Sequence, residues 1–181
     1  MLGTRRLPIL AAMAASILAA APALLASSPA EAQATAQSLG RNGAWEGYVF
    51  EAEDGKVCYM ASRPSKSQGS VSDRGPVYVA VTHRPGNDSR DVISINAGYP
   101  FAEGSEVLVK LDGKDYTLFT RDDTAWTYRS EDDAELTKEM IRGRVMEVRG
   151  KPANGEETLD SFSLMGFTAT YRAISQACNI R

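Results

Sequence analysis

The sequence predicts an all-β protein, a sandwich or barrel of short antiparallel strands to which two helices are added. Asp-Gly or Asn-Gly pairs separate apolar segments at three places along the chain. Such pairs accept positive φ at low cost and are typical of β-hairpins. Several segments alternate apolar and polar residues with the period of a strand. Many short strands with frequent turns favour a sandwich or barrel.

The three hairpins each supply two strands. Asp54-Gly55 joins Trp45–Glu51 to Lys56–Ala61, Asp112-Gly113 joins Glu106–Leu111 to Asp115–Thr120, and Asn154-Gly155 joins Arg144–Arg149 to Thr158–Leu164. The second hairpin has the tightest turn of the three.

Three further segments are predicted strands, and one long segment is a predicted loop. Val77–Thr82 is apolar on both faces, as a central strand would be, whereas Asp91–Tyr99 alternates. Ala125–Arg129 is a short aromatic strand. Ser62–Gly75 is the only long polar stretch of the mature chain and predicts a mobile surface loop.

Two helices interrupt the strands. Asp132-Asp133-Ala134-Glu135 resembles a capping box, Leu136 and Met140 follow on one face, and Gly143 ends the helix. A second helix is predicted over about Thr168–Cys178. Its apolar face carries Phe167, Tyr171, Ile174 and Cys178.

The N-terminus is typical of a secretory signal peptide. Arg5 and Arg6 precede the Ala- and Leu-rich segment Leu7–Leu25, and small residues follow around Ala32. We predict a cleaved leader over residues 1–32, with cleavage after Ala34 as a close alternative. A retained membrane anchor is the other alternative, because the apolar run is nearly long enough to span a bilayer.

The remainder of the chain is predicted to be one domain. Residues 33–44 are expected to be a flexible N-terminal segment, and 45–181 a single β-sandwich domain with no transmembrane span after leader cleavage. The whole chain has 20 Lys+Arg and 23 Asp+Glu, a net charge of −3, so it lacks the basic excess of a nucleic-acid binder. Two cysteines and one histidine are too few for a zinc site, and we predict no metal or cofactor.

Cys58 and Cys178 are predicted to form one disulfide, which is the simplest state of two cysteines in an exported chain. The bond would close a loop of about 120 residues and stabilise the fold by roughly 4–5 kcal/mol in the chain-entropy model. The alternative, a redox-active pair, lacks a Cys-x-x-Cys motif.

His83 is the one candidate general base. It would need a nucleophile and an orienting carboxylate, and Asp88 and Asp91 are close in sequence. No Gly-x-Ser-x-Gly motif occurs, and Ser163–Gly166 lacks its leading glycine. We therefore predict a surface histidine at a strand end, and no catalytic residue.

Acidic and aromatic residues give no stronger sign of a site. Asp122-Asp123 and Glu131-Asp132-Asp133 lack the spacing of a calcium loop and suit a turn and a helix N-terminus. The aromatic residues either line a ligand groove or, more commonly, pack in the core. The residues concerned are Trp45, Trp126, Tyr99, Phe101 and Phe167.

Taken together, these segments resemble the invasion-associated locus B family of exported bacterial proteins. The resemblance spans roughly residues 45 to 178. Its matching segments are Val57-Cys58-Tyr59-Met60, Arg74-Gly75, Val81-Thr82-His83-Arg84-Pro85, Gly98-Tyr99-Pro100-Phe101, Gly104-Ser105, Asp123-Thr124-Ala125-Trp126, Ser163-Leu164-Met165-Gly166-Phe167 and Ala177-Cys178.

The resemblance implies an immunoglobulin-like antiparallel β-sandwich, export to the periplasm or beyond, and one disulfide. It supplies no catalytic residues. We therefore expect a non-enzymatic envelope protein that acts through contacts with an unidentified protein or envelope partner, in host-cell entry for some members of the family. The alternatives are a periplasmic small-molecule or metal-binding protein, or a hydrolase with an unrecognised site.

The Ser62–Gly75 loop is the predicted interaction site. Arg63, Lys66 and Arg74 give it local positive charge on an acidic protein. Such a patch would steer an acidic partner or an anionic envelope surface. The alternative is a mobile loop without a partner.

Overall fold

A computed structural model describes residues 35–180, which form one compact unit. The predicted leader over 1–32 and its cleavage sites lie outside the described residues. The elements are β1 Gln37–Asn42, β2 Trp45–Ala52, β3 Gly55–Ser62, β4 Lys66–Gln68, β5 Tyr78–Arg84, the 3₁₀ turn η1 Pro85–Asn87, β6 Ser89–Asn96, β7 Glu106–Leu111, β8 Lys114–Arg121, β9 Thr124–Trp126, α1 Ser130–Arg142, β10 Val145–Gly150, β11 Thr158–Ser163 and α2 Phe167–Ala177.

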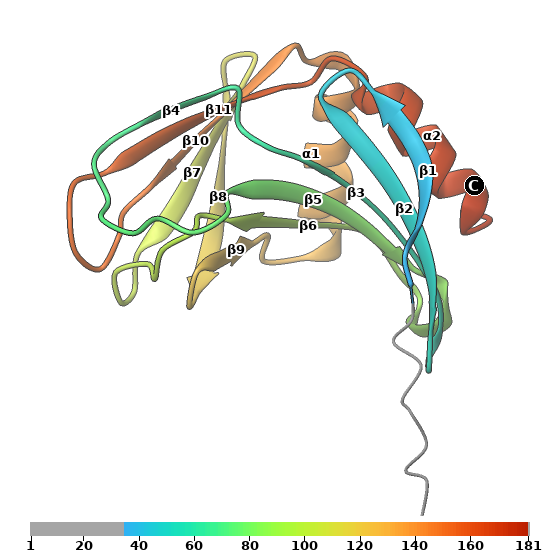
Figure 1. Cartoon of the computed structure of the whole chain (residues 1–181). Coiled ribbons are helices and arrows are strands. Elements are labelled where there is room, and N and C mark those ends of the chain that lie inside the picture. Colours follow the sequence, from blue (N-terminus) through green and yellow to red (C-terminus); the bar gives the residue numbers. More distant parts are fainter. Residues whose placement is uncertain (1–34, 181) are drawn as a thin grey trace, which may run out of the picture. The chain divides into compact units, whose positions relative to one another are not determined.

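The strands form one antiparallel sheet of eleven members in the order β1-β2-β3-β5-β6-β9-β8-β7-β10-β11-β4. The sheet is strongly curved, with β1–β3 toward one end and β4, β10 and β11 toward the other (Figure 1). The predicted all-β, sandwich-like fold is confirmed, with a short helix before the last strands and a C-terminal helix. One hydrogen-bonded ladder nevertheless runs through every strand, so the layers are continuous.

The predicted hairpin turns occupy their expected places. Asp112 and Gly113 both have positive φ, at 47° and 82°, and join β7 to β8 directly. Paired positive φ values match the right-handed twist of the flanking strands, which is why Asp-Gly is favoured there. The Asp54-Gly55 turn joins β2 to β3, and Gly55 also has positive φ.

Helix α2 packs on the β1–β3 end of the sheet. A Cβ atom at Gly47 of β2 would lie 3.2 Å from a Thr170 methyl and 3.3 Å from an Ile174 methyl, so a glycine here lets the helix approach closely. The Trp45 ring meets Phe167 edge-on at 4.8 Å, and its indole N–H donates to the Ser163 carbonyl at 2.9 Å. These buried aromatic contacts join both ends of the chain to one core.

Helix α1 packs on β6 through Leu136 and Met140, both fully buried. The helix begins at Ser130, two residues before the predicted capping box, which does not form. The Asp133 carboxylate instead accepts a hydrogen bond from the Ile93 backbone N–H of β6, at 2.8 Å. The Asp133 side chain thus bonds to a neighbouring strand and not to the first turn of its own helix. This bond holds α1 against β6.

The two edge strands of the sheet lie in segments for which no strand was predicted, so two predictions need correction. Residues 33–44 were expected to be flexible, whereas Gln37–Asn42 form edge strand β1, with a bulge between Ser38 and Gly40. The Ser62–Gly75 loop was expected to be mobile, whereas its Lys66–Gln68 segment forms the opposite edge strand β4, paired with β11. In both cases backbone pairing with a neighbouring strand orders a segment whose exposed polar side chains gave no sign of it.

The disulfide between Cys58 of β3 and Cys178, just beyond α2, is present, with the two Cα atoms 6.0 Å apart. Both cysteines are buried. The bond closes a loop of 120 residues that contains most of the sheet.

Replacing both cysteines, as Cys58→Ala with Cys178→Ala, should lower the free energy of unfolding by about 4–5 kcal/mol, because the unfolded chain regains the entropy of that loop. Urea unfolding of the oxidised parent and the double variant measures the difference. The unreduced parent, denatured, should offer no thiol to a labelling reagent. Equal stability of the two proteins, or two labelled cysteines in the parent, would show the bond to be absent or unimportant.

Candidate functional site

His83, predicted to lie at the surface, is fully buried, so that prediction is wrong. The register of the sheet places His83 opposite Cys58, whose disulfide partner Cys178 follows α2. Helix α2 therefore covers this end of β5. The Tyr171 ring lies edge-on to the imidazole at 5.6 Å.

The hydrogen bonds of His83 define its protonation. The backbone N–H of Asp91 donates to Nδ1 at 3.1 Å, and an amide N–H is always a donor. Nδ1 is therefore the acceptor nitrogen, and Nε2 carries the proton and donates to Ser175 Oγ at 3.2 Å. Burial lowers the pKa of the imidazole below its usual value, although the nearby Asp91 carboxylate opposes this.

Ser175, His83 and Asp91 contain the residue types of a hydrolase triad, but with the wrong proton arrangement. In a triad the carboxylate accepts a proton from Nδ1, and Nε2 is free to remove the serine proton. Here Nδ1 accepts from the backbone, its distance to the Asp91 carboxylate is 3.8 Å, and Nε2 is already protonated. The imidazole cannot serve as a base toward Ser175 in this arrangement.

The Asp91 carboxylate is committed to α2 instead. It accepts a hydrogen bond from the Tyr171 hydroxyl at 2.6 Å. Burial, followed by the bond to Asp91, raises the pKa of the Tyr171 phenol. We call His83, Asp91, Tyr171 and Ser175 the α2 clasp, because two strand residues hold two helix residues. Tyr171, on the apolar face of the predicted helix, and the polar Ser175 one turn further on are the only sequence signal of it.

Arg74, predicted to be an exposed loop charge, is largely buried, with 15% of its side chain exposed. Its guanidinium makes a two-pronged ion pair with Asp160 of β11, donates to the Ala97 carbonyl at 2.9 Å and lies over the Tyr99 ring at 5.1 Å. Arg74 is therefore an internal anchor and is removed from the predicted interaction patch. Its conformation is determined by Asp160, 86 residues further along the chain.

Arg63 and Lys66 are exposed, and neither side chain forms an ion pair within the described part of the chain. Arg63 borders a groove of about 510 Å³ that also contains Arg41, Tyr48 and Tyr78. We call this the Arg63 groove. Of the three predicted loop charges, two remain available to a partner.

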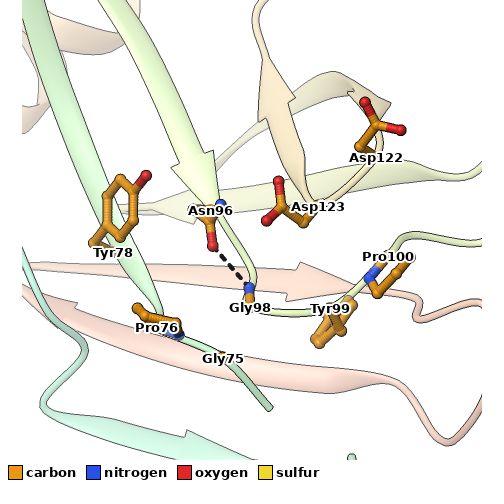
Figure 2. A pocket seen from close by; sticks show the side chains of 9 residues that line it. All are labelled: Gly75, Pro76, Tyr78, Asn96, Gly98, Tyr99, Pro100, Asp122 and Asp123. Carbon is orange, nitrogen blue, oxygen red and sulfur yellow. Dashed lines mark hydrogen bonds between the residues drawn. The ribbon is translucent and has the colours of Figure 1, made fainter. Parts of the chain in front are cut away.

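A second cavity, which shares Tyr78 with the Arg63 groove, has a volume of about 540 Å³. Figure 2 shows Tyr78 and Pro76 on one side and Asp122, Asp123 and Pro100 on the other, with Asn96 between them. We call this the Tyr78 pocket. Sequence reasoning missed it, because its residues come from three separate segments of the chain.

Backbone hydrogen bonds tie the three segments of the Tyr78 pocket together. The Gly75 N–H donates to the Gly98 carbonyl at 2.7 Å, and the N–H groups of Ala97 and Phe101 donate to the carbonyls of Asp123 and Asp122 at 2.9 and 2.8 Å. Gly98 has φ of +72°, and a Cβ there would meet the Gly75 carbonyl oxygen. Only glycine suits this crossing.

The two carboxylates of the pocket differ in their partners. Hydrogen bonds from Asn96 and Thr124 lower the pKa of the Asp123 carboxyl, which keeps it ionised. Asp122 is exposed in the turn between β8 and β9, with φ of 53°. Neither carboxylate has an ion-pair partner among residues 35–180.

Over the described residues, no group of three or more His, Cys, Asp or Glu side chains is arranged to hold a metal ion. No helix in the same part of the chain is both long and apolar enough to cross a membrane.

Comparison with known proteins identifies the family. The family model described as "Invasion associated locus B (IalB) protein" matches residues 45–175. The chain belongs to the invasion-associated locus B family. This confirms the family that the sequence motifs indicated.

A solved structure shares the fold of this family member. The crystal structure of invasion associated protein B from Bartonella henselae superimposes with a TM-score of 0.53 at 14% sequence identity, covering 79% of this chain and 99% of that protein. At this identity the match establishes the fold alone. A comparison with curated proteins gave no match.

Breaking the Arg74–Asp160 pair should strongly destabilise this family member. Arg74→Ala leaves Asp160 buried without its counter-charge, which typically costs about 3–5 kcal/mol. Arg63→Ala, in the same loop but exposed and unpaired, is the control and should change stability by less than about 0.5 kcal/mol. Chemical unfolding of both variants tests the contrast, and similar losses in both would refute the anchor role of Arg74.

Stability should fall as the pH falls below the ordinary histidine pKa of about 6.5, because the unfolded chain then binds a proton that buried His83 does not. The loss is about 1.4 kcal/mol per pH unit over which only the unfolded state is protonated. His83→Gln should be less stable at pH 7.5 but should lack this contribution between pH 7.5 and 5.5. Urea unfolding at both values gives the comparison, and an identical pH dependence in parent and variant would contradict it.

Proposed function

We propose that this member of the invasion-associated locus B family is exported and acts at the cell envelope through contacts with another protein or the envelope surface, rather than by catalysis. The observation that carries the non-catalytic part is the proton arrangement at His83. The only histidine of the chain accepts a backbone N–H at Nδ1, so it cannot act as a base toward Ser175.

Export is supported by two independent features. The buried Cys58–Cys178 disulfide is of a kind that persists in oxidising compartments and is rare in the cytosol. The basic, apolar and small-residue segments of residues 1–32 follow the order of a signal peptide. We therefore propose that residues 1–32 are removed on export and that 45–181 are the functional domain.

The family description and the Bartonella protein's name refer to invasion. We extend the proposal to a contact made during interaction with a host cell. The exposed part of the Ser62–Gly75 segment, with Arg63 and Lys66, is the surface we propose for an acidic partner. Arg63 also reaches the groove beside Tyr78, which adds an aromatic wall to the charged surface.

The first test is fractionation of cells that express the full chain and a variant lacking residues 2–32. The full chain should be recovered outside the cytoplasm with no free thiol, and the truncated chain should stay in the cytoplasm with two. Cytoplasmic retention of the full chain would overturn the export proposal.

The second step of the same experiment tests the contact surface. Arg63→Ala with Lys66→Ala should reduce retention in the washed envelope fraction at low salt, since both charges are exposed and unpaired. Lys138→Ala with Lys151→Ala removes the same charge from other exposed positions and is the matched control. Equal retention of the two double variants at low and high salt would exclude this surface.

A further inference from the structure

The Tyr78 pocket combines apolar walls with an acidic end. Pro76, Tyr78 and Pro100 provide the walls, and Asp122 and Asp123 provide two carboxylates. Tyr78 is 38% exposed, so the face of its ring is accessible to a partner. A volume of about 540 Å³ lies within the range of natural ligand sites.

Within residues 35–180, neither carboxylate of the pocket forms an ion pair. Arg74, which lies over the Tyr99 ring, directs its guanidinium to Asp160 and the Ala97 carbonyl. Asp123 accepts hydrogen bonds from neutral groups only, and Asp122 has no hydrogen-bonded side-chain partner between residues 35 and 180. An incoming positive charge would therefore meet two carboxylates without displacing an existing ion pair.

The pocket is preformed. Three backbone hydrogen bonds connect its three segments. Asn96 also links two of these segments, because its amide oxygen accepts the Gly98 N–H at 3.0 Å and its amide nitrogen donates to Thr124 Oγ1 at 3.2 Å. A preformed site loses little conformational entropy on binding, so a single side chain can occupy it without ordering the protein first.

The chemistry that fits both parts of this pocket is a flexible apolar stem that ends in a cation. Lys and Arg side chains have this character, because their methylene stems pack on apolar surfaces while the head remains polar. An exposed tyrosine ring attracts the same cations through its π-face. A metal ion fits poorly, because calcium prefers six to eight oxygen ligands and the walls here are carbon.

We propose that the Tyr78 pocket receives a basic side chain of a partner protein. The inference rests on the proposed function, in that it assumes action through protein contacts, and it names the chemistry of the partner at one position. The Arg63 groove is lined by the same tyrosine. A partner that presents a basic residue beside an acidic one would engage both.

The test uses the purified protein and three short blocked peptides, acetyl-Gly-Lys-Gly-amide and its analogues with arginine or norleucine at the centre. Norleucine has the lysine stem without the charge. Backbone amide resonances are followed by NMR during titration. The lysine or arginine peptide should shift the amides of Tyr78, Gly98 and Asp123, with a dissociation constant in the millimolar range, on the order expected for one side chain.

The matched variants separate charge from fold. Asp122→Asn with Asp123→Asn should weaken the basic peptides at least about 10-fold. Asp112→Asn is the control, because Asp112 is also a turn aspartate with positive φ but lies outside the pocket. Asparagine tolerates that backbone conformation, so both variants keep their turns. In the parent protein, raising the salt concentration from 0.05 to 0.5 M should weaken binding as well.

Three results would overturn the proposal. One is the absence of localised shifts with either basic peptide at 20 mM, and another is equal binding of the norleucine peptide. The third is tighter binding of free putrescine than of the lysine peptide, which would assign the pocket to a small amine. Each leaves the envelope fractionation result unaffected, so failure of the pocket and failure of the proposed function are distinguishable.

Discussion

Helix α2 must stay on the β1–β3 end of the sheet, and most of the molecule depends on that attachment. The disulfide fixes the end of the helix to β3, while Ser175 and Tyr171 bond to His83 and Asp91 on β5 and β6. These contacts satisfy buried polar groups that would otherwise cost about 1–3 kcal/mol each. The same bonds that make the clasp stable use up the hydrogen-bonding capacity of the only histidine. In this arrangement the His83 imidazole stabilises the fold and is not free to act as a base toward Ser175.

The Arg74–Asp160 pair plays the corresponding part at the other end of the sheet. It ties the segment before β5 to β11 and brings Gly75 against Gly98. The walls of the Tyr78 pocket are therefore held by an ion pair that lies outside the pocket. The guanidinium of Arg74 pairs inside the protein, whereas the carboxylate of Asp122 is exposed, so this end of the Tyr78 pocket is acidic although an arginine lies nearby.

Local chemistry made the hairpins, both helices and the disulfide predictable, since turn dipeptides, apolar periodicity and cysteine count act within a few residues or on the whole chain. The burial of His83 was not predictable, because Ser175 lies 92 residues away and only the closed fold brings it near. Arg74 resembled any loop arginine until Asp160 was placed beside it. The Tyr78 pocket could be anticipated only in part: Gly98 and Asp122-Asp123 signal turns, but not that those turns meet.

Among residues 35–180, the open sheet ends in two edge strands, β1 and β4, and such edges in principle invite another copy to add a strand. Strand β1 carries a bulge with Gly40 at φ of +101°, and β4 is three residues long and follows Pro64. Both features interrupt the regular row of donors and acceptors that templated polymerisation needs. The protein can thus present wide sheet surfaces to other molecules at high local concentration without seeding fibres of itself.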